Sequence, residues 1–176
     1  YANLCDQVIA PSESIQTILQ DRGVTTPISV IPTGVEIDVF GDGDGRRVRD
    51  RLDIPGEAPV IGHVGRLARE KNLTFLATCI AQALTRIGNA HFVVVGGGPA
   101  DYEAEIKAVF QQAGVGDRVH FAGVQKGQDL VDFYHAMDVF VFASKTETQG
   151  MVLAEAMAAG TPVVALDAPG AREIVR

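Results

Sequence analysis

The stretch HFVVVGGGPADYEAEIKAVFQQAGVGDRVHFAG, residues 91–123, gives a clear indication of the fold class. Its two ends, HFVVVG (91–96) and RVHFAG (118–123), are nearly continuous apolar runs of strand length, which is typical of strands buried on both faces. Between them, DYEAEIKAVFQQAG (101–114) repeats apolar residues at intervals of three and four, the period of a helix. A strand, a helix and a second strand in this order predict a right-handed βαβ unit with parallel strands.

The same alternation extends over residues 60–176. Further apolar runs of strand length are VIGHV (60–64), DVFVFA (138–143) and PVVAL (162–166), and further helical patterns are LTFLATCIAQALTRI (73–87), GQDLVDFYHAM (127–137) and MVLAEAMAAG (151–160). Gly88, Gly114 and Gly160 fall where helices are expected to end. We therefore predict an α/β fold, with a Rossmann-like, doubly wound parallel sheet over residues 60–176.

Composition narrows the class of protein. The 176 residues are 47% hydrophobic and 21% charged, which is ordinary for one soluble globular domain. The net charge of −7 provides no basic field, so no nucleic-acid partner is expected. No apolar run approaches the roughly 18 residues that a membrane-spanning helix needs.

Cysteines and histidines give no sign of a metal site. Cys5 and Cys79 lie far apart and fit no metal or redox spacing, so we expect reduced thiols in a cytoplasmic protein. The histidines fit no zinc spacing, and we expect His63, His91 and His120, which lie in strand patterns, to be structural. The chain begins without a Met or a signal pattern, so we expect a piece of a longer protein.

The first 59 residues follow a different pattern. QVIAPSESIQTIL (7–19) indicates a short strand and a helix, and PISVIPTGVEIDVF (27–40) a strand, a PTG turn and a loop. GDGDGRRVRDRLDIPGEAP (41–59) is polar and rich in glycine around a brief basic helical pattern, which indicates a loop or flexible connector. Asp42 and Asp44 lack the downstream Glu of a calcium loop, so no metal is expected there.

Ligands of an open parallel sheet bind beyond the carboxyl ends of its strands. Four predicted loops lie there, and all are polar or rich in glycine: GRLAREKN (65–72), GGGPAD (96–101), AGVQKGQ (122–128) and SKTETQG (144–150). Together they are expected to form one continuous rim, which is where the chemistry of the chain is expected.

Two cations in the first loop have two interpretations. Arg66 directly follows the strand and Lys71 begins the next helix, so both can converge on a phosphate or diphosphate. The alternative is a solvated helix start with a Glu70–Lys71 surface pair, which the charge pattern alone favours. The glycines at 96–98 form no Walker or GxGxxG motif, and they either cradle a phosphate or let the backbone pass close to a neighbour.

The fourth loop leads into a helix near Met151, so its free backbone N–H groups predict an anion site. Glu147 stands in this loop and Glu155 lies one turn into the helix. Both can accept hydrogen bonds from sugar or ribose hydroxyls, or both can belong to an exposed helix face. Their spacing alone favours the exposed face.

Six segments, in order, resemble the C-terminal, donor-binding domain of family-four retaining GT-B glycosyltransferases. They cover nearly the whole chain and are VIAPSES (8–14), VIPTGVEIDVF (30–40), GHVGRLAREKNL (62–73), VVVGGGP (93–99), VHFAGV (119–124) and ETQGMVLAEAMAAGTPVVA (147–165). The most specific element is the pair of glutamates, Glu147 and Glu155. The resemblance implies an N-terminal domain end or interdomain segment and the first strand of the C-terminal domain in 1–40, a connector in 41–59, and the nucleotide-sugar-binding domain in 60–176.

The resemblance also implies roles for individual residues. Arg66 and Lys71 would clamp the donor diphosphate and stabilise charge on the leaving nucleotide, and Glu147 would orient the transferred sugar; these are the expected catalytic residues. Glu155 would accept hydrogen bonds from ribose hydroxyls. The donor-binding set is Gly65, Gly123, Val124, Gln125, Thr148, Gln149, Gly150, Met151, Val152 and Glu155, with the base against 123–125 and backbone amides of 149–152 on sugar and phosphate.

The implied function is transfer of a glucose- or mannose-type hexose from a nucleotide-sugar to a lipid or glycan acceptor, with retention of configuration. The nucleotide-sugar is a substrate, and no cofactor or metal is expected. The acceptor would bind through an N-terminal domain outside this chain, so the chain alone is expected to bind donor without turnover. At Gln149, where many relatives have an aromatic residue, ETQG resembles glucosyltransferases that act on diacylglycerol. We expect a cytoplasmic protein, peripheral at the cytoplasmic face of the membrane in its complete form.

Two other functions are alternatives. A GT-B nucleotide-sugar epimerase would show other acid–base residues in the rim. A non-catalytic α/β binding module, such as a receiver domain, would carry an acidic pair after the first strand, where Gly65 and Arg66 stand instead.

Overall fold

The structure is a computed structural model that describes residues 1–175. Five parallel strands form its main sheet: β3 (Val60–Val64), β4 (His91–Val95), β5 (Val119–Gly123), β6 (Val139–Phe142) and β7 (Val163–Ala165). Their order across the sheet is β5-β4-β3-β6-β7. The chain therefore moves outward from β3 through β4 and β5, and then returns to the other side of β3. This reversal confirms the predicted doubly wound, Rossmann-like sheet.

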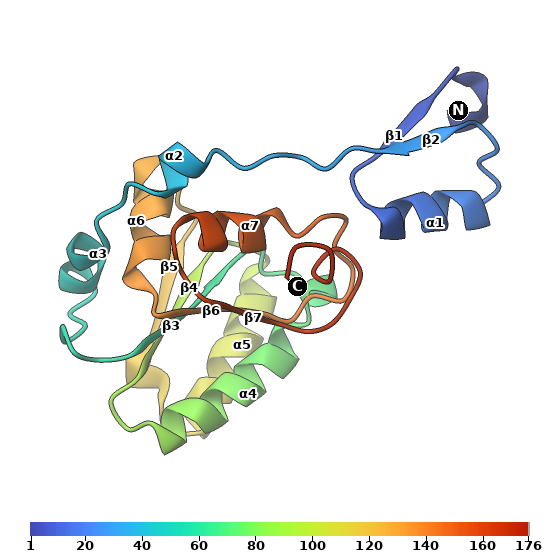
Figure 1. Cartoon of the computed structure of the whole chain (residues 1–176). Helices are drawn as coiled ribbons and strands as arrows, with labels where there is room; N and C mark the ends of the chain where they lie inside the picture. The colour runs from blue at the N-terminus through green and yellow to red at the C-terminus, as the bar shows by residue number, and fades with distance from the viewer. Residues whose placement is uncertain (176) are drawn as a thin grey trace.

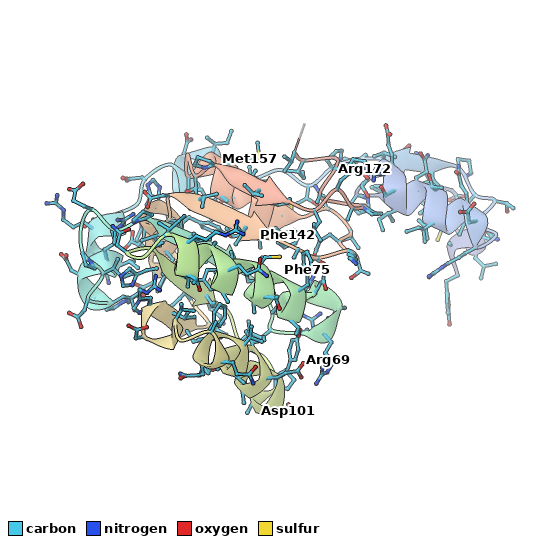
Figure 2. All side chains as sticks on the ribbon, turned by 90° about the horizontal axis from the view of Figure 1, so that it is seen from below. Arg69, Phe75, Asp101, Phe142, Met157 and Arg172 are labelled. Carbon is cyan, nitrogen blue, oxygen red and sulfur yellow. The ribbon has the colours of Figure 1, made fainter. Side chains whose placement is uncertain are left out.

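Helices cover both faces of this sheet. They are α4 (Leu73–Arg86), α5 (Ala100–Gln112), α6 (Gln128–Ala136) and α7 (Met151–Ala158), with short 3₁₀ turns η2 (Arg69–Lys71) and η3 (Gly116–Arg118). Side chains of a strand alternate between faces, so Phe92 and Val94 of β4 pack with α4 and α5, whereas Val93 and Val95 pack with α6 and α7. Figure 1 shows α4 and α5 on one side of the sheet and α7 on the other. The result is two apolar cores, one on each side, and Figure 2 draws the side chains on the ribbon as seen from below.

A small N-terminal unit has a two-stranded sheet of its own, separate from the main sheet (Figure 1). It contains η1 (Ala2–Leu4), β1 (Val8–Ala10), α1 (Glu13–Asp21) and β2 (Ile28–Val30), and an extended segment leads from it to α2 (Ile37–Phe40). The expectation that residues 1–40 supply the first strand of the larger domain differs from the structure. Within residues 1–175, β1 and β2 pair only with each other, and the main sheet begins at β3. Their pairing is parallel because α1 crosses between them.

The stretch 41–59, expected to be a flexible connector, is fixed to the larger domain. It contains α3 (Gly45–Arg51), whose Val48 is buried in the core. Arg49 donates to the carbonyl oxygen of Ala136 at 3.1 Å and pairs with Asp138 at 2.9 Å. The basic pattern seen in the sequence is thus a docked helix, because its cations find acceptors at the end of α6. None of the helices in residues 1–175 is long and apolar enough to cross a membrane.

Candidate functional site

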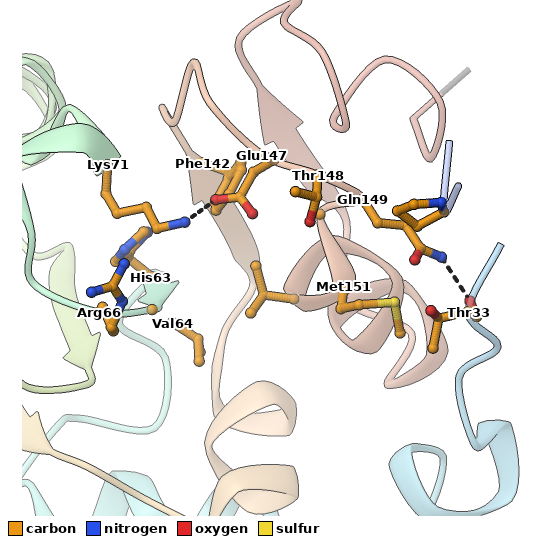
Figure 3. A pocket seen from close by; sticks show the side chains of 14 residues that line it. Thr33, His63, Val64, Arg66, Lys71, Phe142, Glu147, Thr148, Gln149 and Met151 are labelled. Carbon is orange, nitrogen blue, oxygen red and sulfur yellow. Dashed lines mark hydrogen bonds and ion pairs between the residues drawn. The ribbon is translucent and has the colours of Figure 1, made fainter. Parts of the chain in front are cut away.

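The carboxyl ends of β3 and β6 are neighbours where the strand order reverses, which is where doubly wound sheets bind ligands. A cavity of about 490 Å³ opens there, a volume in the range of small-molecule sites. Figure 3 shows the side chains that line it. Nine of the thirteen residues predicted from the sequence are among them: Gly65, Arg66, Lys71, Glu147, Thr148, Gln149, Gly150, Met151 and Val152.

Lys71 and Glu147 form an ion pair in this cavity, marked by a dashed line in Figure 3. Their side chains are only 17% and 15% exposed. Lys71 ends η2, and the next residue, Asn72, adopts a left-handed conformation and donates from Nδ2 to the carbonyl oxygen of Ala143 at 3.2 Å. This bond ties the loop after β3 to the end of β6. It therefore directs Lys71 toward the loop that carries Glu147, 76 residues further along the chain.

Arg66 lines the cavity beside them but is held only loosely. Its side chain is 73% exposed, and it pairs with Glu70 at 2.6 Å. The charge pattern favoured a surface pair of Glu70 with Lys71. In the structure Glu70 pairs with Arg66 instead, because Lys71 turns toward Glu147. An exposed pair of this kind contributes about 0–1 kcal/mol, so an anion in the cavity can compete for the guanidinium.

The glycines that follow β4 serve close backbone packing. A Cβ at Gly96 would overlap the carbonyl oxygen of Gly65, and one at Gly98 would overlap that of Leu67. The N–H of Leu67 donates to the carbonyl oxygen of Gly97 at 2.9 Å. Of the two interpretations left open by the sequence, the structure shows the close passage of a neighbouring backbone. These glycines thereby fix the loop that carries Arg66.

The first turn of α7 forms another wall of the cavity. Gly150 precedes the helix with φ of 65°, a left-handed conformation that glycine adopts without strain, and no side chain of residues 1–175 caps the helix. The N–H groups of Met151 and Val152 come before the first intrahelical bonds, so they carry the partial positive charge of a helix N-terminus. Gly170 supports the loop before them, because a Cβ there would lie 2.6 Å from the carbonyl oxygen of Glu147.

The N-terminal unit is bonded to the same loop. The buried side chain of Gln149 donates from Nε2 to the carbonyl oxygen of Thr33 at 2.9 Å, a bond drawn in Figure 3. Ser12, which caps α1, donates from Oγ to the carbonyl oxygen of Thr148 at 2.8 Å. Thr33 and Pro11 therefore line the cavity, although nothing in their local sequence predicted it.

Four predicted residues lie outside the cavity. Glu155 accepts a hydrogen bond from the hydroxyl of Tyr134 at 2.7 Å, and burial together with Glu155 raises the pKa of Tyr134 well above its ordinary value, so this hydroxyl stays a donor. Gly123 ends β5, two strands away from β3, and Val124 and Gln125 follow it. Val124 is 65% exposed, and Gln125 donates to the carbonyl oxygen of Ala122 at 2.6 Å. The ribose and base roles of these four residues stay predictions.

His63 is a further lining residue that the sequence did not predict. It lies on β3 and is 1% exposed, with Nδ1 3.0 Å from the carbonyl oxygen of Val141. Burial lowers its pKa to about 4. His91 and His120, by contrast, bond to each other at 2.9 Å and lie outside the cavity, as structural histidines. The strand pattern predicted a structural histidine at His63, but no local signal showed that it would meet the cavity.

Comparison with known proteins places the chain in a family. Residues 58–176 match the family described as "Glycosyl transferases group 1". The chain belongs to this family, which confirms the resemblance seen in the sequence.

Individual relatives agree with this placement. The chain is 33% identical over 165 residues to an alpha-monoglucosyldiacylglycerol synthase of Streptococcus pneumoniae, and the match covers 91% of this chain and 37% of the relative. It is 33% identical to a GDP-mannose-dependent alpha-mannosyltransferase of Mycobacterium tuberculosis, over 98% of this chain and 42% of the relative. The crystal structure of Anabaena HepE in complex with UDP and glucose superposes with a TM-score of 0.90 and 30% identity, covering 99% of this chain and 48% of HepE. The chain thus spans less than half of each.

Proposed function

We propose that this chain is the donor-binding domain of a retaining glycosyltransferase, which transfers a glucose- or mannose-type hexose from a nucleotide-sugar to a lipid or glycan acceptor. The observation that carries the proposal is the convergence of Arg66, Lys71, Glu147 and the N-terminus of α7 on one cavity. The relatives support the two hexoses and the lipid acceptor, because one is a glucosyldiacylglycerol synthase and another a GDP-mannose-dependent mannosyltransferase. The HepE structures, which hold UDP, support the class of donor.

The charges of the cavity suit a diphosphate. An ammonium has three donors, so Lys71 can bind a phosphate oxygen while it keeps Glu147. Arg66 exchanges its exposed partner, Glu70, for a second phosphate oxygen. The N–H groups of Met151 and Val152 add the positive end of a helix dipole. Two cations and a helix terminus can neutralise the diphosphate in this way, so the proposed reaction is metal-independent.

The same groups favour the departure of the nucleotide. When the bond from the sugar to the diphosphate breaks, the leaving phosphate gains negative charge, and preformed positive groups stabilise that charge more than they stabilise the bound substrate. Glu147, held in place by Lys71, offers its second carboxylate oxygen to a sugar hydroxyl and so orients the sugar. The acceptor and the remaining catalytic groups belong to the rest of the complete protein, so the chain by itself binds donor without turnover. We place the complete protein in the cytoplasm, at the membrane face where a lipid acceptor would lie.

Calorimetry tests the proposal. UDP, GDP and ADP and their hexose conjugates are titrated into the complete protein and into Arg66→Ala and Lys71→Ala variants. One nucleotide series is expected to bind, and each substitution is expected to weaken it about tenfold or more, the value of one charge-assisted hydrogen bond. Arg69→Ala is the matched control, because Arg69 lies in the same loop but pairs with Glu105 at 2.8 Å, away from the cavity.

The result separates the proposal from its rivals. No binding of any nucleotide, or binding that neither substitution weakens, would contradict the donor site. Binding without sugar transfer by the complete protein would favour a non-catalytic module. Interconversion of the bound sugar without transfer would favour an epimerase.

A further inference from the structure

His63 lines the cavity from β3, the strand at which the strand order of the sheet reverses. Its ring lies alongside those of Phe140 and Phe142 of β6, with both ring-centre distances at 6.2 Å. These apolar neighbours and the carbonyl oxygen of Val141 fix the orientation of the imidazole. Figure 3 shows the ring between Arg66 and Lys71, below the chain of Lys71. The side chain is therefore held in one orientation, and it lines the same cavity as both proposed phosphate ligands.

The contacts of the ring define its protonation. A carbonyl oxygen only accepts hydrogen bonds, so the nitrogen facing Val141, Nδ1, carries the proton. Burial disfavours a second proton, and the imidazole is neutral. The other nitrogen, Nε2, is consequently a bare acceptor.

This acceptor has no hydrogen-bond partner anywhere in residues 1–175, although it is buried. Buried polar atoms in proteins are nearly always paired, because leaving one unpaired costs free energy. Gly65, which also lines the cavity, adjoins Nε2, because a Cβ at Gly65 would lie only 3.3 Å from this nitrogen. The atom is thus placed to receive a group that enters the cavity.

The chemistry of that group follows from what Nε2 can do. It can only accept, so its partner must supply a hydrogen. An ionised diphosphate supplies none, and the base and the ribose are expected at the loop 123–125 and at Glu155, which lie outside the cavity. The hexose supplies several hydroxyls. Glu147, which we propose orients the hexose, lies near enough to His63 to act on its pKa, as does Lys71.

We propose that Nε2 of His63 accepts a hydrogen bond from a hydroxyl of the transferred hexose, and that His63 thereby contributes to selection of the donor sugar. The proposal rests on the donor site described above. It adds a neutral acceptor to the charged groups, one that contacts the sugar and not the phosphates. A neutral acceptor discriminates between hydroxylated and deoxygenated sugars without repelling the neighbouring diphosphate.

Two substitutions test it in the complete protein. His63→Asn keeps a donor for the Val141 carbonyl but has no atom at the place of Nε2, whereas His63→Gln can offer its amide oxygen near that place. UDP and UDP-glucose serve as probes, as in the HepE structures. We expect His63→Asn to bind UDP within about twofold of the unsubstituted protein and UDP-glucose about tenfold more weakly, and His63→Gln to recover part of that loss.

A second measurement needs no substitution, in case a variant fails to fold. The ¹⁵N resonance of His63 Nε2 is expected to move when UDP-glucose is added, to move less with UDP, and to return toward the UDP position with one of the four monodeoxy analogues of UDP-glucose. An unchanged Nε2 resonance, or equal losses for UDP and UDP-glucose in His63→Asn, would overturn the proposal. If the unsubstituted protein binds none of the nucleotides, the donor site itself fails, which is a different outcome.

Discussion

Replacement of Lys71 by Met is expected to destabilise the fold and weaken nucleotide binding together. The change keeps most of the side-chain volume but leaves Glu147, which is 15% exposed, without its cation. Exposed pairs contribute about 0–1 kcal/mol, and removal of one partner from a fully buried pair costs about 3–5 kcal/mol. For this mostly buried pair we expect a loss of about 2 kcal/mol, or about 4–8 °C in Tm for a domain of this size.

The double variant of Lys71→Met with Glu147→Gln measures the coupling between the two side chains. Glu147→Gln removes the carboxylate that Lys71→Met leaves unpaired, so the combination is expected to be more stable than the sum of the two single changes by about 1–2 kcal/mol. For UDP, Lys71→Met removes charge-assisted hydrogen bonds and is expected to weaken binding about 10- to 150-fold. Glu147→Gln is expected to leave UDP binding unchanged or slightly tighter, because it removes only a competitor for the ammonium.

Urea unfolding and calorimetry measure these effects. Lys107→Met is the matched control, because Lys107 also pairs with a glutamate, Glu103 at 2.6 Å, but on the exposed surface of α5. It is expected to change stability by less than about 1 kcal/mol and UDP binding not at all. Additive stabilities in the double variant would show that Lys71 and Glu147 do not stabilise each other, and full UDP affinity in Lys71→Met would show that Lys71 does not bind the diphosphate.

Three further predictions concern the supports of the site. Gly98→Ala is expected to cost about 1–3 kcal/mol in unfolding experiments, because its Cβ would overlap the backbone after β3. Gly88→Ala is the control, because a Cβ there would meet no atom of residues 1–175 within 4 Å, and equal stabilities of the two variants would contradict the close packing. Gln149→Ala is expected to cost about 1 kcal/mol and to speed proteolysis near Thr33, whose carbonyl loses its donor; unchanged cleavage would show that the bond does not hold the N-terminal unit. The pKa of His63 falls from 6.5 to about 4 in the folded state, so the unfolded state binds more protons between these two pH values. The free energy of unfolding is therefore expected to fall by about 3 kcal/mol as the pH falls from about 6.5 to 4. His63→Phe is expected to remove this dependence on pH, and an unchanged dependence would contradict the role of His63.

Most of the fold could be predicted because buried parallel strands and amphipathic helices leave a periodic signal. The five strands of the main sheet and the helices between them fall within a residue or two of their predicted positions. The small unit at the N-terminus was harder, since three-residue strands carry little pattern and their pairing depends on contacts far along the chain.

The candidate site was only partly readable. The rule that ligands bind at the carboxyl ends of strands, with the resemblance, selected nine residues that the cavity gathers. Which loops meet depends on strand order, so the loop 123–125, two strands away from β3, lies outside the cavity. Glu155 also lies outside it, because its carboxylate turns toward Tyr134. Local charge spacing paired Glu70 with Lys71, whereas the fold offers Lys71 a partner 76 residues away. The open nitrogen of His63 depends on three-dimensional packing and leaves no trace in the sequence.

A crystal structure of the complete protein with UDP tests the proposed donor site. We expect the diphosphate in the cavity between β3 and β6, with Lys71 and Arg66 on phosphate oxygens and the N–H groups of Met151 and Val152 facing the same charge. UDP bound elsewhere, or bound with Arg66 still on Glu70 and no phosphate contact from Lys71, would contradict it.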